Sequence, residues 1–446
     1  MHWLFEKRTL FLTIFTIICF GQITFAAETS SSGQSQNNAK NKSCAVERIS
    51  PRKAKYSLWM RQRDAIKMVD LIGKTDVSIV ARGGKGIYNA HPTTVLLDDQ
   101  KTLYCVWNMG HGGNASPLAK SSDGGKTWKR IDSAMPRCYS LFKNCPSIYR
   151  IKDPQGKERI FVLAQRTMTP KGASITEETE KYSGYMPRVM SEDGGISWKA
   201  LPPLGKPDLK SKFMCIMTFS SMIELKDGST LGFFHRGNDK GKDKDLCIMK
   251  SITKDGGLTW STPETVLTND DLGGKLQPCE PLLIRSPDGN ELCCIMRENS
   301  RINGTSLAMF SRDEGKTWSK PVDTPWALSG DRHSGIYLPD GRLLIAFRDQ
   351  VPNRGLPSGL YFGAWLGTYE DIKTGAPGQY RILLSKCAPM PPKNNSGLRF
   401  DGYYPSLHYL PDGTIIATTY ECLDGDTACS ITSHRFKLSD IESNAK

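Results

Sequence analysis

The sequence predicts an all-β fold, a six-bladed β-propeller with four-stranded antiparallel blades, and two interleaved repeats predict it. The first repeat reads Ser/Thr-x-Asp-x-Gly-x-Ser/Thr-Trp and occurs four times. An Asp-x-Gly pair closes a tight turn, because Asp bonds back to nearby N–H groups and Gly accepts positive φ, and the Trp that follows covers the turn. Strand-rich repeats at intervals of 70, 62 and 58 residues indicate propeller blades. The four copies occupy residues 121–128, 191–198, 253–260 and 311–318.

The second repeat is a hairpin of two apolar strands around an acidic or glycine-containing turn. It occurs six times, at residues 94–107, 148–166, 222–236, 282–297, 336–348 and 407–421. Six hairpins imply six blades, in which the hairpin supplies the inner strands and the Asp motif closes the outer ones. The last two outer turns are degenerate, and six unrelated hairpins in a sandwich are the alternative. The motif aspartates are predicted to be structural, because they close outer turns: Asp123, Asp193, Asp255 and Asp313.

The N-terminus has the pattern of a secretory signal over residues 1–27. Lys7-Arg8 precede an apolar run from Thr9 to Phe20, and Thr24-Phe-Ala26 offers a small-residue cleavage site. The run is too short for a membrane span. We therefore expect a secreted protein, periplasmic or extracellular, with a disordered lead over 28–43 and one propeller domain over 44–446.

The net charge indicates which ligands the protein binds, and the cysteine content indicates whether disulfides or metal sites are expected. The net charge of +13 favours an acidic substrate, whereas the scattered Lys and Arg residues and the absence of a recognition motif argue against nucleic acid. Of 13 cysteines, 12 remain after Cys19 is removed, so disulfides are plausible, with Cys422–Cys429 the first pair to test. No Cys-x-x-Cys or His-rich cluster occurs. We expect a monomer without metal or cofactor.

Two segments flank the repeats. Residues 59–71 carry apolar side chains that predict a short helix packed on the disc, and the strand 77–80 that follows is expected to close the ring by joining the last blade. Long polar connections predict loops over one rim, where the function of a propeller normally resides. They cover residues 167–187, 238–246 and 264–278, and residues 370–400 are predicted to form another loop before the sixth blade.

The hairpin register predicts which side chains meet at the axis. Counting back eight residues from each hairpin Asp gives the start of the innermost strand: Ala90, Cys145, Phe219, Glu280, Arg332 and Tyr404. The second inner strand ends in a further ring: Arg166, Arg236, Arg297, Arg348 and Glu421. Clustered arginines repel one another unless an anion balances them, and a carboxylate is the fitting ligand. For any single Arg, a salt bridge between blades is the alternative.

At this point the chain resembles the exo-sialidases (neuraminidases), six-bladed propellers with the same Asp motif, over about residues 85–436. In that family an arginine triad holds the sialic acid carboxylate, a Glu activates a Tyr nucleophile, and an Asp is the acid/base. The resemblance implies Glu280 and Arg297 as the Glu and second triad Arg, and Tyr404 as the nucleophile. The third triad Arg would be Arg348 or Arg354.

Two positions depart from the family pattern. Ala90-His91-Pro92 replaces the first triad Arg, for which Arg332 or Arg82 could substitute, and Arg236 joins them as a candidate substrate ligand. Gly110-His111-Gly112-Gly113 replaces the expected Asp. His111 is then the candidate proton donor, because histidine ordinarily titrates near neutrality. The departures indicate a divergent branch.

The sequence thus predicts a secreted exo-glycosidase that releases terminal sialic acid or a similar acidic sugar with retention, through a covalent Tyr404 intermediate. A phenol paired with Glu280 suits this reaction, because an anionic nucleophile would be repelled by the substrate carboxylate. A non-hydrolytic protein that binds acidic glycans is the main alternative, and a structural interaction propeller is the third. A buried core role is the competing interpretation for Tyr404, and a turn role for His111.

Overall fold

The computed structural model describes residues 65–84, 86–169, 171, 174, 181–237, 245–349, 360–390 and 400–445. The chain divides into two units, Met1–Ser50 and Pro51–Lys446, and every described residue belongs to the second. The predicted signal segment, the lead after it and Arg354 lie outside the described residues.

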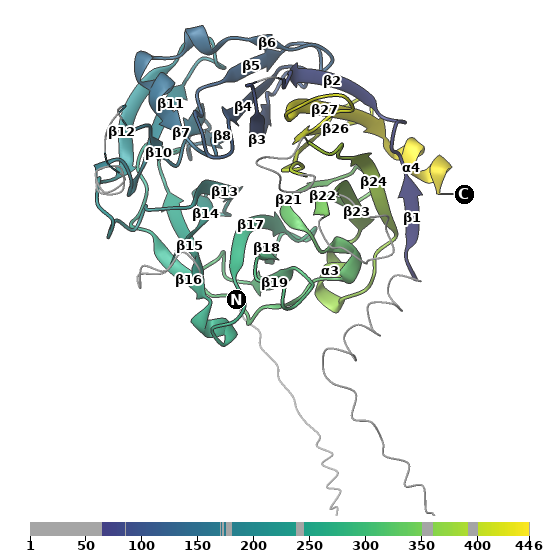
Figure 1. Cartoon of the computed structure of the whole chain (residues 1–446). Helices are drawn as coiled ribbons and strands as arrows, with labels where there is room; N and C mark the ends of the chain where they lie inside the picture. The colour runs from purple at the N-terminus through teal and green to yellow at the C-terminus, as the bar shows by residue number, and fades with distance from the viewer. Residues whose placement is uncertain are drawn as a thin grey trace, which may run out of the picture. The chain divides into compact units, whose positions relative to one another are not determined.

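Six β-sheets stand around a central axis as the blades of a propeller, which confirms the predicted fold class (Figure 1). In blades 1 to 4 the innermost strand comes first in the chain, whereas in blades 5 and 6 the strand at the outer edge comes from earlier in the chain. Each of the six hairpins forms an inner strand pair. From the axis outward, blade 1 has β3 (Asn89–Leu96), β4 (Leu103–Met109), β5 (Leu118–Ser121) and β6 (Lys129–Arg130). Blade 2 has β8 (Ser147–Lys152), β9 (Glu158–Leu163), β11 (Tyr185–Ser191) and β12 (Lys199–Gly205). Blade 3 has β13 (Met217–Glu224), β14 (Thr230–Gly237), β15 (Leu246–Thr253) and β16 (Glu264–Thr268).

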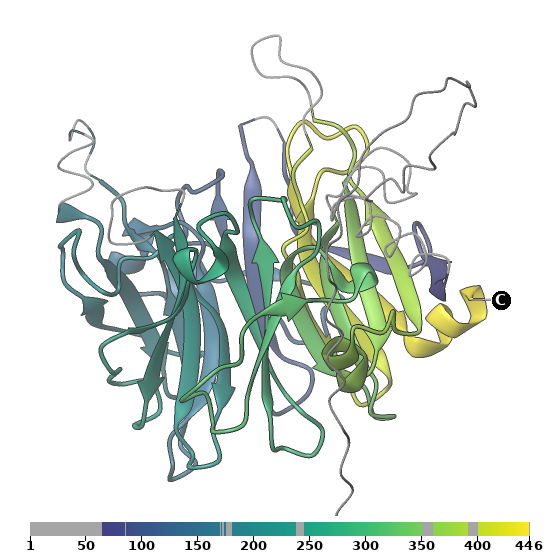
Figure 2. The ribbon, with the colours of Figure 1, turned by 90° about the horizontal axis from the view of Figure 1, so that it is seen from below.

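The remaining three blades repeat this order, and Figure 2 shows them from the side. Blade 4 has β17 (Pro278–Arg285), β18 (Leu292–Glu298), β19 (Leu307–Ser311) and β20 (Val322–Asp323). Blade 5 has β21 (Asp331–Tyr337), β22 (Leu343–Asp349), β23 (Tyr361–Gly367) and β24 (Tyr380–Lys386). Blade 6 has β25 (Ser406–Tyr409), β26 (Thr414–Glu421), β27 (Ser430–Lys437) and β2 (Asp76–Ala81). The shorter elements are β7 (Phe142–Lys143) paired with β10 (Arg166–Thr167), η1 (Asp132–Ala134), η2 (Arg137–Leu141), η3 (Asp270–Leu272), η4 (Trp326–Leu328), α3 (Tyr369–Thr374) and α4 (Leu438–Asn444).

The ring closes through a strand from the N-terminal side of the repeats. β2 pairs antiparallel with β27 and completes blade 6, as the sequence predicts. Residues 59–64 of the predicted helix over 59–71 lie outside the described residues, and Ala65 is helical. The prediction is wrong over Lys67–Asp70, because this segment forms β1, which pairs parallel with β24 at the outer edge of blade 5. Val69 is buried against that edge while Lys67, Met68 and Asp70 are exposed, so one inward residue is enough to anchor the strand.

Each Asp motif closes an outer hairpin by the same bonds. In blade 2, Ser191 Oγ and Ser197 Oγ donate to the Asp193 carboxylate at 2.7 and 2.5 Å, and Trp198 Nε1 donates to the Gly195 carbonyl at 3.1 Å. The hydrogen bonds from Ser197 and Ser191 lower the pKa of Asp193 to about 2. This geometry is that of a turn closure at the rim. In blade 5 the outer connection is α3, and in blade 6 β2 arrives from the other end of the chain, which explains the two degenerate turns.

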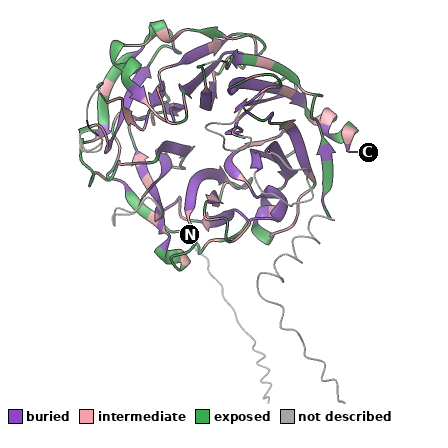
Figure 3. Cartoon of the chain, in the orientation of Figure 1, coloured by how far each residue is buried: buried purple, intermediate pink, exposed green. Residues whose placement is uncertain are grey.

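The core lies between blades, and the innermost strands are buried while outer turns face solvent (Figure 3). Cys422 and Cys429 are free thiols, so the predicted disulfide is wrong. Within the described ranges, no helix is long and apolar enough to cross a membrane.

Candidate active site

A backbone irregularity recurs at or just before the start of the innermost strand in four blades. His91, Cys145, Glu280 and Arg332 all adopt positive φ, at 51°, 38°, 53° and 50°. The strand register shifts directly at these positions in blades 1, 4 and 5. A bulge of this kind re-aims a side chain, and strained backbone outside glycine tends to be kept where function needs it. The ring predicted by counting from the hairpin Asp is therefore present in part. Cys145, Glu280 and Arg332 share this conformation, whereas in blade 6 the positive φ falls on Tyr403, one residue before Tyr404.

The predicted axis residue is one position too early in blade 1, and in blade 3 the predicted residue belongs to the core instead of the axis. Asp99, not its neighbour Asp98, closes the first turn, since the Thr102 N–H donates to Asp99 at 2.8 Å, and this moves His91 into the place predicted for Ala90. In blade 3, Phe219 is fully buried and stacks on Trp260 at 4.5 Å, so it belongs to the core.

The second ring is also shifted in several blades. Arg297 lies opposite Cys279 and Arg348 opposite Asp331, so these two arginines occupy equivalent positions. In blades 1, 3 and 6 the equivalent residue is not an arginine. It is Asn108 opposite Ala90, His235 opposite Met217, and Tyr420, whose carbonyl accepts from the Tyr403 N–H.

Arg166, Arg236 and Glu421 each lie one position further along, where side chains alternate to the other face of the sheet. Arg166 pairs with Lys143 in the small β7–β10 sheet, and Arg236 donates to the carbonyls of Gly237 and Ser211 at 3.0 and 3.4 Å. Glu421 accepts from His434 at 2.7 Å. None of the contacts described for these three residues reaches Tyr404.

Tyr404 and Glu280 meet across the axis. They come from blades 6 and 4, which are not neighbours, and Tyr404 donates to Glu280 Oε1 at 2.5 Å. Arg297 Nη1 lies 3.2 Å from both the Glu280 carboxylate and the Tyr404 hydroxyl. Burial and the Glu280 charge raise the pKa of Tyr404 well above its usual value. Burial also raises the pKa of Glu280, but Arg297 and the Tyr404 hydrogen bond outweigh this and lower it to about 2. At neutral pH the pair is therefore a phenol held by a carboxylate.

Two arginines flank this pair. Arg348 stacks its guanidinium on the Tyr404 ring, 4.3 Å from the centroid. Its Nε donates to the Gly402 carbonyl at 2.5 Å, and its Nη2 donates to the Tyr420 hydroxyl at 2.6 Å. Arg297 Nε lies 3.1 Å from Asp331, close enough for an ion pair although not aligned as a hydrogen bond.

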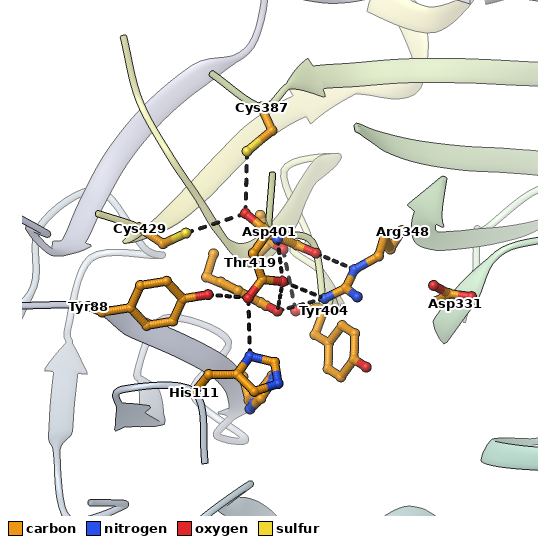
Figure 4. A network of polar contacts seen from close by, with 12 residues as sticks. Tyr88, His111, Asp331, Arg348, Cys387, Asp401, Tyr404, Thr419 and Cys429 are labelled. Atoms are coloured by element: carbon orange, nitrogen blue, oxygen red, sulfur yellow. Dashed lines mark hydrogen bonds and ion pairs between the residues drawn. The ribbon is translucent and has the colours of Figure 1, made fainter. Parts of the chain in front are cut away.

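A second carboxylate, Asp401, lies at the centre of a network on the other side of Arg348 (Figure 4). Arg348 Nη2 donates to Asp401 Oδ1 at 3.2 Å, and Tyr420 donates to the same oxygen at 2.9 Å. His111 Nδ1 and the Tyr88 hydroxyl both contact Oδ2, His111 at 3.1 Å. Burial raises the pKa of Asp401, but the His111 hydrogen bond and the Arg348 charge hold it well below its usual value. Asp401 is thus ionised at neutral pH.

His91 stands where the family resemblance leads one to expect an arginine. Its ring lies 4.8 Å from that of His111 and 4.9 Å from that of Tyr404, and Nδ1 contacts Asn108 at 3.1 Å. Burial, reinforced by the His111 ring, lowers the pKa of His91 to about 3. The position predicted to lack a cation therefore holds a neutral imidazole.

The other predicted arginines lie apart from Tyr404. Arg332 is buried near Glu280 and donates to the Ser220 carbonyl at 3.1 Å. Arg82 is half-exposed and pairs with Asp426 at 2.8 Å. Sequence reasoning missed the nearer residues: His91, Tyr88, Asp331, Asp401 and Tyr420. Two features of the sequence could have identified them: the turn at Asp99, which sets the register of His91, and the position of Asp401 three residues before Tyr404.

Residues 144–356 match the BNR repeat-like domain. Similar solved structures include the GH93 α-L-arabinofuranosidase of Fusarium graminearum with arabinobiose (TM-score 0.55, 13% identity, 83% of this chain and 100% of that one). An α-L-arabinanase of Penicillium chrysogenum complexed with arabinobiose (0.53, 12%, 82% and 99%) and the Hadza microbial sialidase Hz136 (0.53, 16%, 82% and 69%) are also similar. These likenesses show a shared fold. A search of curated proteins finds no match.

Proposed function

We propose that this propeller, which matches the BNR repeat-like domain over residues 144–356 and shares its fold with a sialidase, is a retaining exo-glycosidase with Tyr404 as nucleophile. The observation that carries this proposal is the 2.5 Å hydrogen bond from Tyr404 to a buried, ionised Glu280. A nucleophile next to a positioned base is the general signature of covalent catalysis. A tyrosine in this role belongs to the known exceptions to the two-carboxylate scheme.

In the first step, the Tyr404 oxygen attacks the anomeric carbon as its proton passes to Glu280. The bond from that carbon to the leaving oxygen breaks, and His111 donates a proton to this oxygen. Asp401 holds Nδ1 of His111, which leaves Nε2 to exchange protons. In the second step, His111 takes a proton from water, the water oxygen attacks the anomeric carbon, and Tyr404 leaves and regains its proton from Glu280. Arg297 stabilises the charge that develops on the phenol oxygen, from 3.2 Å.

Two sugar classes fit this chemistry. Terminal sialic acid or a similar acidic sugar is the substrate that the sequence predicts from its clustered arginines. A neutral sugar is the second candidate, because Arg297 and Arg348 already contact protein carboxylates. Secretion remains a proposal from the N-terminal pattern.

The test is hydrolysis by the purified protein of methylumbelliferyl and nitrophenyl glycosides, including the α-sialoside and the α-L-arabinofuranoside. Tyr404→Phe removes only the nucleophilic oxygen, and we expect turnover to fall by about 10³-fold or more. Tyr403→Phe is the matched control, because the Tyr403 hydroxyl bonds Glu421 and Ser385, away from the axis. Equal turnover in wild type and Tyr404→Phe would refute the nucleophile, and sugar binding without hydrolysis would favour the lectin alternative.

A further inference from the structure

We infer, resting on the proposed function, that the sugar bound beside Tyr404 carries no carboxylate, and that Asp401 is the specificity-determining residue because it occupies the anion site of Arg348.

Arg348 has its carboxylate-binding edge occupied from within the chain. A guanidinium binds a carboxylate best through two parallel N–H groups on one edge. On Arg348 the Nε and Nη2 edge faces the Gly402 carbonyl, the Tyr420 hydroxyl and Asp401. The contact with Asp401 is oriented by Tyr88 and His111 on its other oxygen, so this carboxylate is held in place and not merely nearby. A substrate carboxylate would have to displace it.

Arg297 is similarly engaged. Its Nη1 faces Glu280 and the Tyr404 hydroxyl, and its Nε faces Asp331. Arg332, the third guanidinium of the ring, donates to a backbone carbonyl. The two arginines nearest to Tyr404 thus act on the catalytic pair and on protein carboxylates.

The three carboxylates of this cluster are already paired within the chain. Glu280 pairs with Arg297, Asp331 with Arg297 and Arg301, and Asp401 with Arg348. An added substrate carboxylate would be a fourth anion beside three others, and like charges in a partly buried site disfavour one another. A sugar that is recognised by hydroxyl groups meets no such cost.

The test measures binding instead of turnover, because Asp401 also positions His111 and its replacement will slow catalysis. The probe is 2,3-didehydro-2-deoxy-N-acetylneuraminic acid, a sugar analogue with a ring carboxylate, titrated calorimetrically into the full-length protein. We expect no binding by wild type at millimolar probe. Asp401→Asn, which keeps an acceptor for Tyr88 and Tyr420, should bind at least about tenfold more tightly, and adding Arg348→Gln should abolish the gain. Asp426→Asn removes a carboxylate that pairs with Arg82 instead, and it should behave as wild type.

Binding of the probe by wild type, weakened by Arg348→Gln, would overturn the inference, and so would a folded Asp401→Asn variant that gains nothing. The wild-type titration alone decides if that variant does not fold. The Tyr404→Phe comparison depends on turnover and not on this probe, so failure of the proposed function and failure of this inference are distinguishable.

Discussion

His333 should make the stability of the propeller sensitive to mild acid. This residue is 3% exposed, donates from Nε2 to the Leu328 carbonyl at 3.1 Å and packs on Phe347, while its Nδ1 is buried without a partner among the described residues. Burial lowers the pKa of His333 from 6.5 to about 4, although the Leu328 hydrogen bond works in the opposite direction. The unfolded chain therefore takes up a proton at a higher pH than the folded protein does.

The sign and the size follow from this difference. Because the unfolded state binds more protons between pH 6.5 and about 4, the free energy of unfolding falls as pH decreases through that window. From pH 7 to pH 5 the contribution of His333 is a loss of about 2 kcal/mol, and it reaches about 3 kcal/mol below the folded pKa. His333→Gln has no group that titrates in this window, so its loss should be smaller by that amount.

The assay is urea unfolding at pH 7 and pH 5, with the free energy obtained by linear extrapolation. His333→Phe is a second control, because it also lacks a titrating group but leaves the Leu328 carbonyl without its donor. It should show the same reduced pH dependence as His333→Gln at a lower overall stability. Wild type and His333→Gln losing equal stability between the two pH values would refute the reasoning.

Three further predictions test other parts of the molecule. Glu280→Gln should lower turnover by about 10²-fold or more with the fold intact, because the phenol loses its base, and unchanged turnover would contradict that role. Gly195→Ala should lower the melting temperature far more than Gly194→Ala, because both have positive φ but only at Gly195 would a Cβ lie 2.5 Å from the Tyr104 ring; equal losses would refute this blade-to-blade contact. Arg381→Met should cost about 3–5 kcal/mol in urea unfolding, because it removes the fully buried cation paired with Asp349, and a neutral effect would show that the pair contributes no net stability.

The fold could be predicted because its signals are local and repeated. Asp193 and its equivalents each close a turn with their own neighbours, and the hairpins carry the alternation of strands, so neither depends on distant contacts. The predicted helix was wrong over residues 67–70, because apolar spacing in a short segment does not separate a helix from a strand, and pairing with the edge of β24 stabilises the strand. Disulfide pairing failed because compartment and cysteine parity do not report which thiols lie close together.

The site could be predicted only where one register held along whole strands. Glu280, Arg297, Arg348 and Tyr404 follow regular hairpin spacing, and the structure brings them together. His91 was missed because one extra turn residue shifts the count, and a shift of one residue exchanges the two faces of a strand. Such errors are invisible in a sequence without the turn geometry.

Asp401 shows a different limit, and it bears on what arginine counts mean. It lies before β25 in irregular backbone, where no periodicity assigns a direction to its side chain. The number of arginines in the hairpins therefore suggested an anion site. The carboxylate that fills this site, Asp401, belongs to a segment outside those hairpins. The net charge of +13 does not alter this, because a distant field can attract an acidic ligand but cannot supply the free N–H edge that holds a carboxylate. Substrate charge in a propeller of this kind is set by the balance of paired groups at the axis, and here that balance leaves no guanidinium beside Tyr404 without a carboxylate partner.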